Sequence, residues 1–389
     1  MAYDYVKRQA DEIEAWIIDI RRRLHMQPEL SGQEEKTQRF ILDRLAELNI
    51  ETITYPNQYA VVGLIRGTFP GKTIALRADM DALPVQEATD LPFASQIPGR
   101  MHACGHDAHM AIALGAAKIL MANRDKLHGQ VKLLFEPAEE TTGGAQDMVA
   151  AGCLQNPLVD AVFGLHMLPD QPAGVVYSRE GCVSGASNAL SIHVSGLGCH
   201  GAYPERGVDA IVIASQIITA LQTLVSRNVS PLDSAVVTFG KITGGTARNV
   251  ICDHVEIEGT LRTLKPETRA LLKEKLQEIP AAIARAMGGC ATVAAPDGYG
   301  AVYNDEALHD QFLTVAKDMI GDKNIITREH PSLGVESFSF FVEKTPGVYY
   351  DLGCGVGSAL HTCDFHVDEG CLKIGASLQA AMALDFLKG

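Results

Sequence analysis

The stretch VKLLFEPAEE, residues 131–140, joins a short apolar run to a cluster of glutamates around a proline. The apolar run is typical of a buried β-strand, and the glutamates come directly after its carboxyl end. Similar apolar runs occur at residues 60–67, 73–78, 160–166 and 347–353, and helical patterns alternate with them. Because amphipathic helices must cover both faces of such strands, the alternation predicts an α/β domain with a mainly parallel sheet.

A different order of elements occupies the middle of the chain. Strand, helix, strand, strand, helix and strand patterns follow one another between about residues 186 and 300. This is the order of a small ferredoxin-like α+β unit. We therefore expect a catalytic or binding domain formed by residues 1–185 and 301–389, with a smaller satellite domain inserted at residues 186–300.

The composition excludes two classes of partner. Of the 389 residues, 47 are acidic and 33 are basic, so the formal net charge is −14, which repels nucleic acid and anionic membranes. The most apolar helical segment, residues 207–225, contains Asp209, Ser215 and Gln216, and we interpret it as a buried helix of a soluble protein. The first residues lack the apolar stretch of a secretory signal, and the nine cysteines are scattered, so we expect a cytoplasmic protein with reduced thiols.

Acidic residues and histidines gather at the ends of the predicted strands. They are Asp79, Asp81, Glu136, Glu139, Glu140, His166 and His361. In α/β sheets the carboxyl ends of the strands converge on one edge, so we expect these side chains to lie close together. Without a cation, buried carboxylates would repel one another there. The pattern therefore predicts a divalent-metal site.

The segment MHACGHDAHM, residues 101–110, adds a thiol and imidazoles to this set. Gly105 permits a backbone conformation in which Cys104 and His106 face one centre. Thiolate and imidazole suit zinc, whereas Glu140 suits a harder ion such as manganese, so the site has the ligands for several metals.

Two other roles of Cys104 stay open at this point. Cys104 has the surroundings of a nucleophile, with His102 or His106 as its base, and it has the chemistry of a redox thiol. The nucleophile would leave the other strand-end groups unused, and the next cysteine that would resolve an oxidised thiol is Cys153. The metal role is therefore favoured.

Eight segments together resemble the peptidase M20 family, in particular its amidohydrolase branch of hippurate hydrolases, N-acyl-amino-acid amidohydrolases and auxin-conjugate hydrolases. They are RRRLHMQPELSGQEEKT (21–37), LRADMDALPV (76–85), MHACGHDAHM (101–110), EPAEE (136–140), GLHMLP (164–169), GLGCHGAYPERGVDA (196–210), GGTARNVICDHVEIEGTLRT (244–263) and LHTCDFHVDE (360–369). The segments keep the family's order and span nearly the whole chain.

The resemblance implies a centre of two divalent metal ions, zinc or manganese first, with cobalt and nickel as alternatives. Cys104 would bridge the ions; the other ligands would be His106 and His166 for one ion, and Glu140 and His361 for the second. Glu139 corresponds to the general base and acid that acts on a metal-bridging water. Asp81 corresponds to a residue that contacts the metal ligands without binding the metal itself.

The resemblance also implies that residues 186–300 form a lid or dimerisation domain that contributes to the site. His200 would stabilise the oxyanion, reaching a neighbouring subunit of a homodimer or tetramer, while Asn249 and Arg248 would hold the substrate carboxylate. The expected substrate is an N-acyl amino acid. Alternatives are a dipeptidase or carbamoyl-amide hydrolase on the same scaffold, and, more remotely, a cysteine hydrolase using Cys104 or a non-catalytic binding protein.

Three places depart from the family pattern. A proline is usual shortly after the last histidine ligand, but Thr362, Cys363 and Asp364 follow His361 here. Cys252 stands where proline is usual, and Ser337 stands where an aspartate is common. We expect these changes to affect the shape of the pocket or the support behind the ligands.

Overall fold

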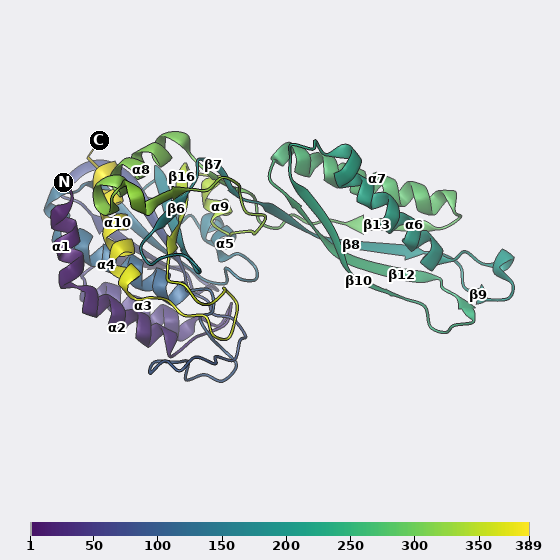
Figure 1. The fold of residues 1–389 in the computed structure, drawn as a ribbon, viewed down its shortest axis with the longest axis horizontal. Coiled ribbons are helices and arrows are strands. Elements are labelled where there is room, and N and C mark those ends of the chain that lie inside the picture. The colour runs from purple at the N-terminus through teal and green to yellow at the C-terminus, as the bar shows by residue number, and fades with distance from the viewer. Residues whose placement is uncertain (1, 389) are drawn as a thin grey trace. The chain divides into compact units, whose positions relative to one another are not determined.

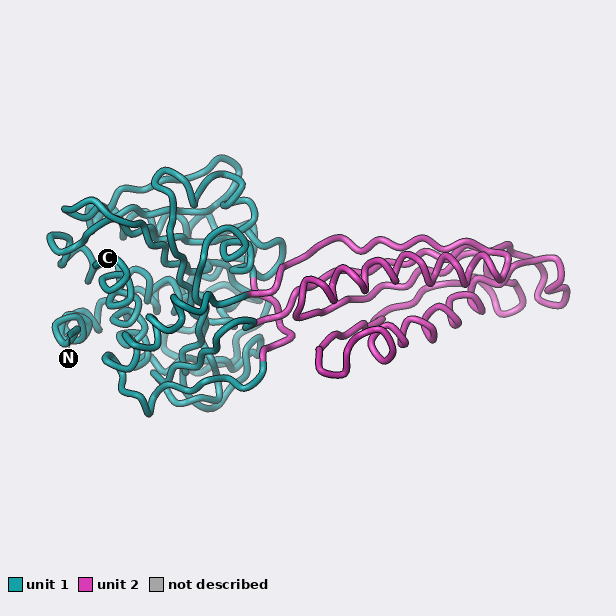
Figure 2. The backbone as a smooth tube through the Cα atoms, turned by 90° about the horizontal axis from the view of Figure 1, so that it is seen from above, with its two compact units in different colours: residues 1–183, 303–330, 337–389 teal, residues 184–302, 331–336 magenta. Residues whose placement is uncertain are grey.

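The computed structural model describes residues 2–388, and the chain divides into two compact units (Figure 2). Unit 1 comprises residues 1–183, 303–330 and 337–389, and unit 2 comprises residues 184–302 and 331–336. The expected second catalytic segment, 301–389, is thus interrupted. Residues 331–336 lie in unit 2 because they pair with the first residues of that unit. Ser332 forms a β-bridge with Ser184, and the carbonyl oxygen of Gly334 accepts a hydrogen bond from the backbone N–H of Gly185.

Unit 1 is built on a mixed eight-stranded sheet (Figure 1). Its strands in sheet order are β1 (Glu51–Thr54), β2 (Val61–Arg66), β4 (His128–Glu136), β3 (Phe69–Asp79), β5 (Ala161–Leu168), β16 (Gly347–Gly353), β6 (Val176–Ser178) and β15 (Ile325–Thr327). The central neighbours β4, β3, β5 and β16 are parallel, whereas β1, β2 and β4 pair antiparallel. The α/β class with a parallel centre is confirmed.

Helices cover this sheet. They are α1 (Asp4–Glu12), α2 (Glu14–His25), α3 (Glu35–Glu47), α4 (His106–Ala122), α5 (Gly144–Ala150), α8 (Glu306–Ile320), α9 (Ser339–Val342) and α10 (Gly370–Phe386). Helix α4 packs against α10, α2 and β3, so it lies deep in the unit. Its run of small apolar residues is buried on nearly every face, which makes it a rigid support for the segment that precedes it.

Unit 2 is a two-layer α+β unit. In chain order its main elements are β8 (Ala186–Ser195), α6 (Ala210–Thr223), β10 (Ala235–Gly244), β12 (His254–Thr263), α7 (Pro266–Ala286) and β13 (Cys290–Ala294). The four strands form an antiparallel sheet in the order β10-β12-β8-β13. β9 (Cys199–His200) and β11 (Val250–Ile251) form a separate two-stranded ribbon. A second ribbon, of β7 (Gly181–Ser184) and β14 (Val302–Asn304), lies at the boundaries between the two units in the chain.

The apolar helix of unit 2 is less buried than the sequence predicts. The helical segment Ala210–Asn228 has the length and composition of a membrane span, and 33% of its most apolar window is buried. One face, with Ile213, Ile217 and Leu221, packs into the core of unit 2, while Ile211 on the other face is exposed. The expectation of a buried helix is therefore wrong for that second face, because a two-layer unit covers a helix from one side only.

Candidate metal centre

Strand ends in unit 1 bring the predicted side chains together. Asp79 and Glu136 are the last residues of β3 and β4, and they lie side by side in the parallel register. His166 lies near the end of β5, opposite Asp351 of β16. His361 comes from the loop between β16 and α10, where its φ is +63°. The carboxyl ends of the parallel strands thus meet at one edge, as expected.

The Cys104–His106 segment needs its glycine. Gly105 caps the N-terminus of α4 with φ +88°, a conformation that favours glycine. A Cβ at this position would lie 2.9 Å from Cγ of Met167, so any larger residue would clash with β5. Because Gly105 turns the chain sharply, Cys104 and His106 both face the strand ends.

The five predicted ligands form one compact cluster. Sγ of Cys104 lies 3.4 Å from Nε2 of His166 and 3.3 Å from Nε2 of His361. Oε1 of Glu140 lies 3.3 Å from Nε2 of His361 and 3.8 Å from Nε2 of His106. The donor atoms fall into two groups that share Cys104: Cys104, His106 and His166, and Cys104, Glu140 and His361. We call these five residues the donor cluster.

Two buried polar atoms of the donor cluster fit the binding of metal ions. Nε2 of His106 and Oε1 of Glu140 are buried, and neither has a hydrogen-bond partner anywhere in residues 2–388. An unsatisfied buried polar atom is costly, and two of them aimed at a shared centre beside a thiol are the atoms that a cation would satisfy. Sulfur, imidazole and carboxylate donors together suit zinc or manganese.

Hydrogen bonds on the side away from the donor cluster fix the orientation of two imidazoles. Nδ1 of His106 donates to the carbonyl oxygen of Asp81 at 2.8 Å, and Nδ1 of His166 donates to that of Met167 at 2.8 Å. A carbonyl oxygen only accepts, so each Nδ1 carries the proton and each Nε2 keeps its lone pair toward the cluster. The side chain of Asp81 also accepts from the backbone N–H of Glu140 at 3.0 Å, so Asp81 links two ligand-bearing segments.

A buried arginine that the sequence analysis passed over organises the carboxylates. Arg77 lies fully buried in β3 and donates to Asp79 at 2.6 Å, to Glu136 at 2.7 Å and to Oγ of Ser337 at 2.9 Å. Its single positive charge pairs with both Asp79 and Glu136 and so offsets part of the negative charge at the strand ends. A charged residue inside an apolar strand run was the signal in the sequence that could have identified it.

Burial and nearby charges distinguish between the metal-ligand and nucleophile roles of Cys104. Burial raises the pKa of the Cys104 thiol well above its usual range, whereas a nucleophilic cysteine needs a lowered pKa. Burial also acts to raise the pKa of Glu140, but the neighbouring imidazole of His361, 3.3 Å away, and the charge of His106 outweigh it and lower that pKa to about 2. The cluster therefore presents an ionised carboxylate and a thiol that requires a cation to ionise, which favours the metal role.

Two further buried groups near the cluster were missed. Asp107, the residue after His106, accepts from Nε of Arg21 and pairs with Nδ1 of His25, both at 2.9 Å. Glu34 accepts from the backbone N–H of Ala138 at 2.8 Å, and burial raises its pKa to about 7. Asp107 thus anchors the chain next to His106, and Glu34 holds the backbone two residues before Glu140. Nothing in their local sequence distinguishes them from surface charges.

The remaining histidines of the segment 101–110 lie outside the donor cluster. His109 donates from Nδ1 to Asp79 at 2.6 Å and accepts at Nε2 from the backbone N–H of Met167 at 2.9 Å, so both nitrogens are used. His102 is buried, and neither ring nitrogen has a hydrogen-bond partner within residues 2–388. Burial lowers the pKa of His102 to about 4, so its ring is neutral.

The predicted residues of the satellite lie together in unit 2. His200 pairs with Val250 in the β9–β11 ribbon, and the carbonyl oxygen of Asn249 accepts from the N–H of Gly201 at 2.8 Å. Arg248, next in the chain to Asn249, is exposed. The ribbon therefore presents all three at one place in unit 2, and their roles toward the donor cluster stay predictions.

A mixed sheet with a parallel centre carries a sulfur, nitrogen and oxygen donor cluster at its strand ends, which indicates a metal-dependent enzyme. The chain belongs to peptidase family M20/M25/M40, whose profile matches residues 75–385. The resemblance drawn from the sequence motifs is thereby confirmed. The protein is a metal-dependent hydrolase of amide bonds.

Named relatives cover almost the whole chain. Thermostable carboxypeptidase 1 of Saccharolobus solfataricus is 39% identical and aligns over 98% of both chains. IAA-amino acid hydrolase ILR1-like 4 of Arabidopsis thaliana is 40% identical over 96% of this chain and 86% of its own. Among solved structures, the YXEP protein of Bacillus subtilis, described as a dinuclear metal binding peptidase of the M20 family, has a TM-score of 0.86 and 34% identity, covering 97% of this chain and 99% of its own.

Proposed function

We propose that the protein hydrolyses the amide bond of N-acylated amino acids, with Glu139 as general base and acid at a centre of two divalent ions. The observation that carries the proposal is the division of the donor cluster into two groups that share Cys104, with Glu139 beside them: donor atoms of Glu139, His106 and Glu140 all lie within 4.8 Å of one another. The names of the two relatives support the substrate class, because a carboxypeptidase and an IAA-amino acid hydrolase both release an amino acid from an amide.

The residues divide the chemistry among them. When bound, the ions polarise the substrate carbonyl and bring the pKa of a water toward about 7. The carboxylate of Glu139 takes a proton from the attacking water as its oxygen adds to the carbonyl carbon. Glu139 then gives that proton to the leaving nitrogen as the C–N bond breaks, so the products are a carboxylate and a free amino acid. The backbone N–H of Ser337 donates to Oε1 of Glu139 at 3.2 Å and orients it.

Unit 2 would supply the contacts to the rest of the substrate. In the proposal, His200 donates a hydrogen bond to the developing oxyanion, and Asn249 and Arg248 bind the substrate carboxylate. The family resemblance adds that His200 acts in a neighbouring subunit, so a homodimer is part of the proposal. Sedimentation of the protein in solution would test that part separately.

The proposal is tested by metal analysis followed by a substrate panel. Purified protein should contain two divalent ions per chain, with zinc or manganese first. It should hydrolyse N-acetyl, N-benzoyl or longer N-acyl amino acids faster than dipeptides and N-carbamoyl amino acids. Preference for a dipeptide or a carbamoyl amide would instead assign one of the alternative activities on the same scaffold.

A variant pair tests the role of Glu139. Glu139→Gln should keep the metal content and lower kcat by about 10²-fold to 10⁴-fold, because the amide cannot take the proton. Glu47→Gln, on the exposed end of α3, is the matched control and should change neither quantity. Full turnover of Glu139→Gln would remove Glu139 from the mechanism.

A further inference from the structure

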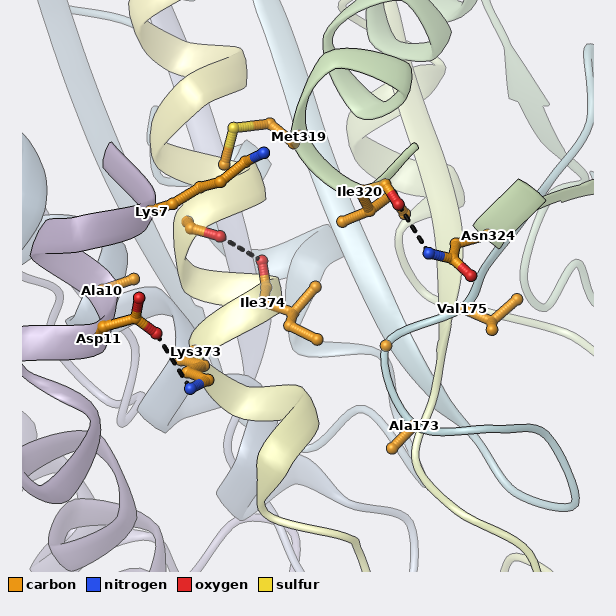
Figure 3. A pocket seen from close by; sticks show the side chains of 12 residues that line it. Lys7, Ala10, Asp11, Ala173, Val175, Met319, Ile320, Asn324, Lys373 and Ile374 are labelled. Carbon is orange, nitrogen blue, oxygen red and sulfur yellow. Dashed lines mark hydrogen bonds and ion pairs between the residues drawn. The ribbon is translucent and has the colours of Figure 1, made fainter. Parts of the chain in front are cut away.

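The charged side chains that line the pocket between α1, α8 and α10 are already engaged within the protein (Figure 3). Nζ of Lys373 lies 3.0 Å from the carboxylate of Asp11, and Nζ of Lys7 donates to the carbonyl oxygen of Asp318 at 3.2 Å. The chemistry of this pocket therefore selects no ligand. A buried carboxylate near the donor cluster, that of Glu34, has a more definite role.

The turn after β4 has an unusual backbone conformation at Ala138. Its φ is +56°, in the left-handed region that residues with a side chain rarely adopt. The carbonyl oxygen of Ala138 accepts from the backbone N–H of Gly143 at 2.9 Å, which closes the turn. Glu139 and Glu140 follow directly in the chain. The conformation of Ala138 therefore sets the direction in which the backbone presents both carboxylates.

Glu34 holds the other backbone group of Ala138. Oε1 of Glu34 accepts from the backbone N–H of Ala138 at 2.8 Å, and the side chain of Glu34 is fully buried. The two residues lie 104 positions apart in the chain, so the contact forms only when the chain folds. Strained left-handed residues persist only where the surrounding structure restrains them. The hydrogen bonds to Glu34 and Gly143, one on each backbone group of Ala138, supply that restraint.

Glu139 is therefore restrained from two directions. The backbone N–H of Ser337 contacts its carboxylate, and the fixed backbone of Ala138 precedes it in the chain. Only one oxygen of Glu34 takes part, because Oε2 is buried and has no hydrogen-bond partner within residues 2–388. The amide oxygen of a glutamine would supply the same acceptor as Oε1 of Glu34. An apolar side chain would leave the buried N–H of Ala138 unpaired.

We propose that Glu34 is a positioning residue for Glu139. By holding Ala138 in the left-handed conformation, Glu34 aims the carboxylate of Glu139 at the donor cluster before any substrate binds. Glu34 acts through the backbone and contacts neither the substrate nor the attacking water. Its effect on turnover rests on the proposed function, in which Glu139 is the general base, whereas its hold on Ala138 does not.

Hydrogen exchange of the Ala138 amide tests the hold itself, without turnover and in the metal-free protein. Mass spectrometry with fragmentation to single residues should show exchange at least about tenfold faster in Glu34→Leu than in the parent protein. Glu34→Gln keeps the acceptor and should exchange at close to the parent rate. Glu35→Leu, at the exposed first residue of α3, is the matched control and should leave the exchange of Ala138 unchanged. Parent-like exchange in Glu34→Leu would overturn the proposal.

Steady-state kinetics then tests the catalytic consequence. Glu34→Leu should lower kcat by about tenfold to 10²-fold with a smaller change in KM, because a displaced base acts poorly only in the transition state. Glu34→Gln should retain most of kcat. Adding Ala138→Gly to Glu34→Leu should raise kcat by about fivefold, because glycine adopts the left-handed conformation without strain.

The outcomes separate this proposal from the proposed function. A folded Glu34→Gln protein that lost its turnover would show that the acid group of Glu34 is needed, which contradicts a role in positioning; this test holds even if Glu34→Leu does not fold. An unchanged kcat in Glu34→Leu, while Glu139→Gln is inactive, would also overturn the positioning role. Full turnover of Glu139→Gln would instead refute the proposed function, and the exchange of the Ala138 amide would still decide whether Glu34 holds the turn.

Discussion

The backbone N–H of Ser337 donates to Oε1 of Glu139 at 3.2 Å, across 198 residues of sequence. The same serine donates from Oγ to Oε1 of Glu136 at 2.6 Å and accepts from Arg77 at 2.9 Å. Ser337 therefore connects the proposed general base to the buried arginine. This network accommodates a serine where the family resemblance leads us to expect an aspartate, because Arg77 already has two carboxylate partners, Asp79 and Glu136.

Restoring the acid at this position should shift the pH profile. In Ser337→Asp a further carboxylate would lie beside Glu136 and Glu139, and like charge raises the pKa of a carboxyl group. Glu139 would then stay protonated to higher pH, so the acidic limb of kcat/KM should move up by about one pH unit. Ser339→Ala, a buried serine of the neighbouring α9, is the control and should leave the limb in place. An unshifted limb in Ser337→Asp would show that Ser337 does not act on Glu139.

Loss of the Cys104 thiol, which both ligand groups share, should lower both the metal content and the activity. Cys104→Ser replaces the only donor that belongs to both ligand groups, so the bound metal should fall by at least one ion per chain and turnover should fall with it. Cys363→Ser removes an exposed cysteine two residues after His361 and should keep both. Plasma emission spectroscopy on the purified variants measures the metal. A fully loaded but inactive Cys104→Ser protein would revive the nucleophile role.

The buried pair of His25 and Asp107 should make stability depend on pH. Burial acts to lower the pKa of His25, but the charge of Asp107 and hydrogen bonds to Asp107 and Glu87 outweigh it and raise that pKa to about 9. Since the folded pKa lies above the unfolded value of about 6.5, the stabilisation is complete below pH 6.5 and is lost as the pH rises through 9. The difference corresponds to an upper bound on the order of 3 kcal/mol.

Urea unfolding at pH 6 and at pH 9.5 measures this dependence. In His25→Gln the free energy of unfolding should be lower at pH 6 and should change less between the two pH values than in the parent protein. His128→Gln, at an exposed position, should keep the parent's dependence. If His25→Gln retained the full dependence, the linked proton would belong to another group.

The proposed oxyanion role of His200 predicts a change in kcat that is larger than the change in KM. His200→Ala should lower kcat by about 10²-fold to 10³-fold with a smaller change in KM, because the lost hydrogen bond forms only in the transition state. His254→Ala removes another histidine of unit 2, which stacks on His193 at 5.9 Å, and should change neither constant. A raised KM with an unchanged kcat would make His200 a substrate-binding residue instead.

The sequence by itself determined the class of the fold and the place of the site. Alternating apolar runs and helices specify an α/β sheet through local periodicity, and the strand-end rule then locates Asp79, Glu140, His166 and His361 on one edge. The Cys104–Gly105–His106 segment could also be predicted from sequence, because the need for glycine at φ +88° is a local property of the backbone. Each of these inferences depends on neighbours in the chain.

Only the tertiary structure decided how the site is supported. The contact of Ser337 with Glu139, the hydrogen bonds of Arg77 to Glu136 and Ser337, and the pairing of Glu34 with Ala138 all join residues far apart in sequence. Local pattern does not encode such contacts, because they depend on how strands and helices register in three dimensions. Burial of α6 on one face only follows from the same cause, since the number of layers packed on a helix is a property of the assembled unit.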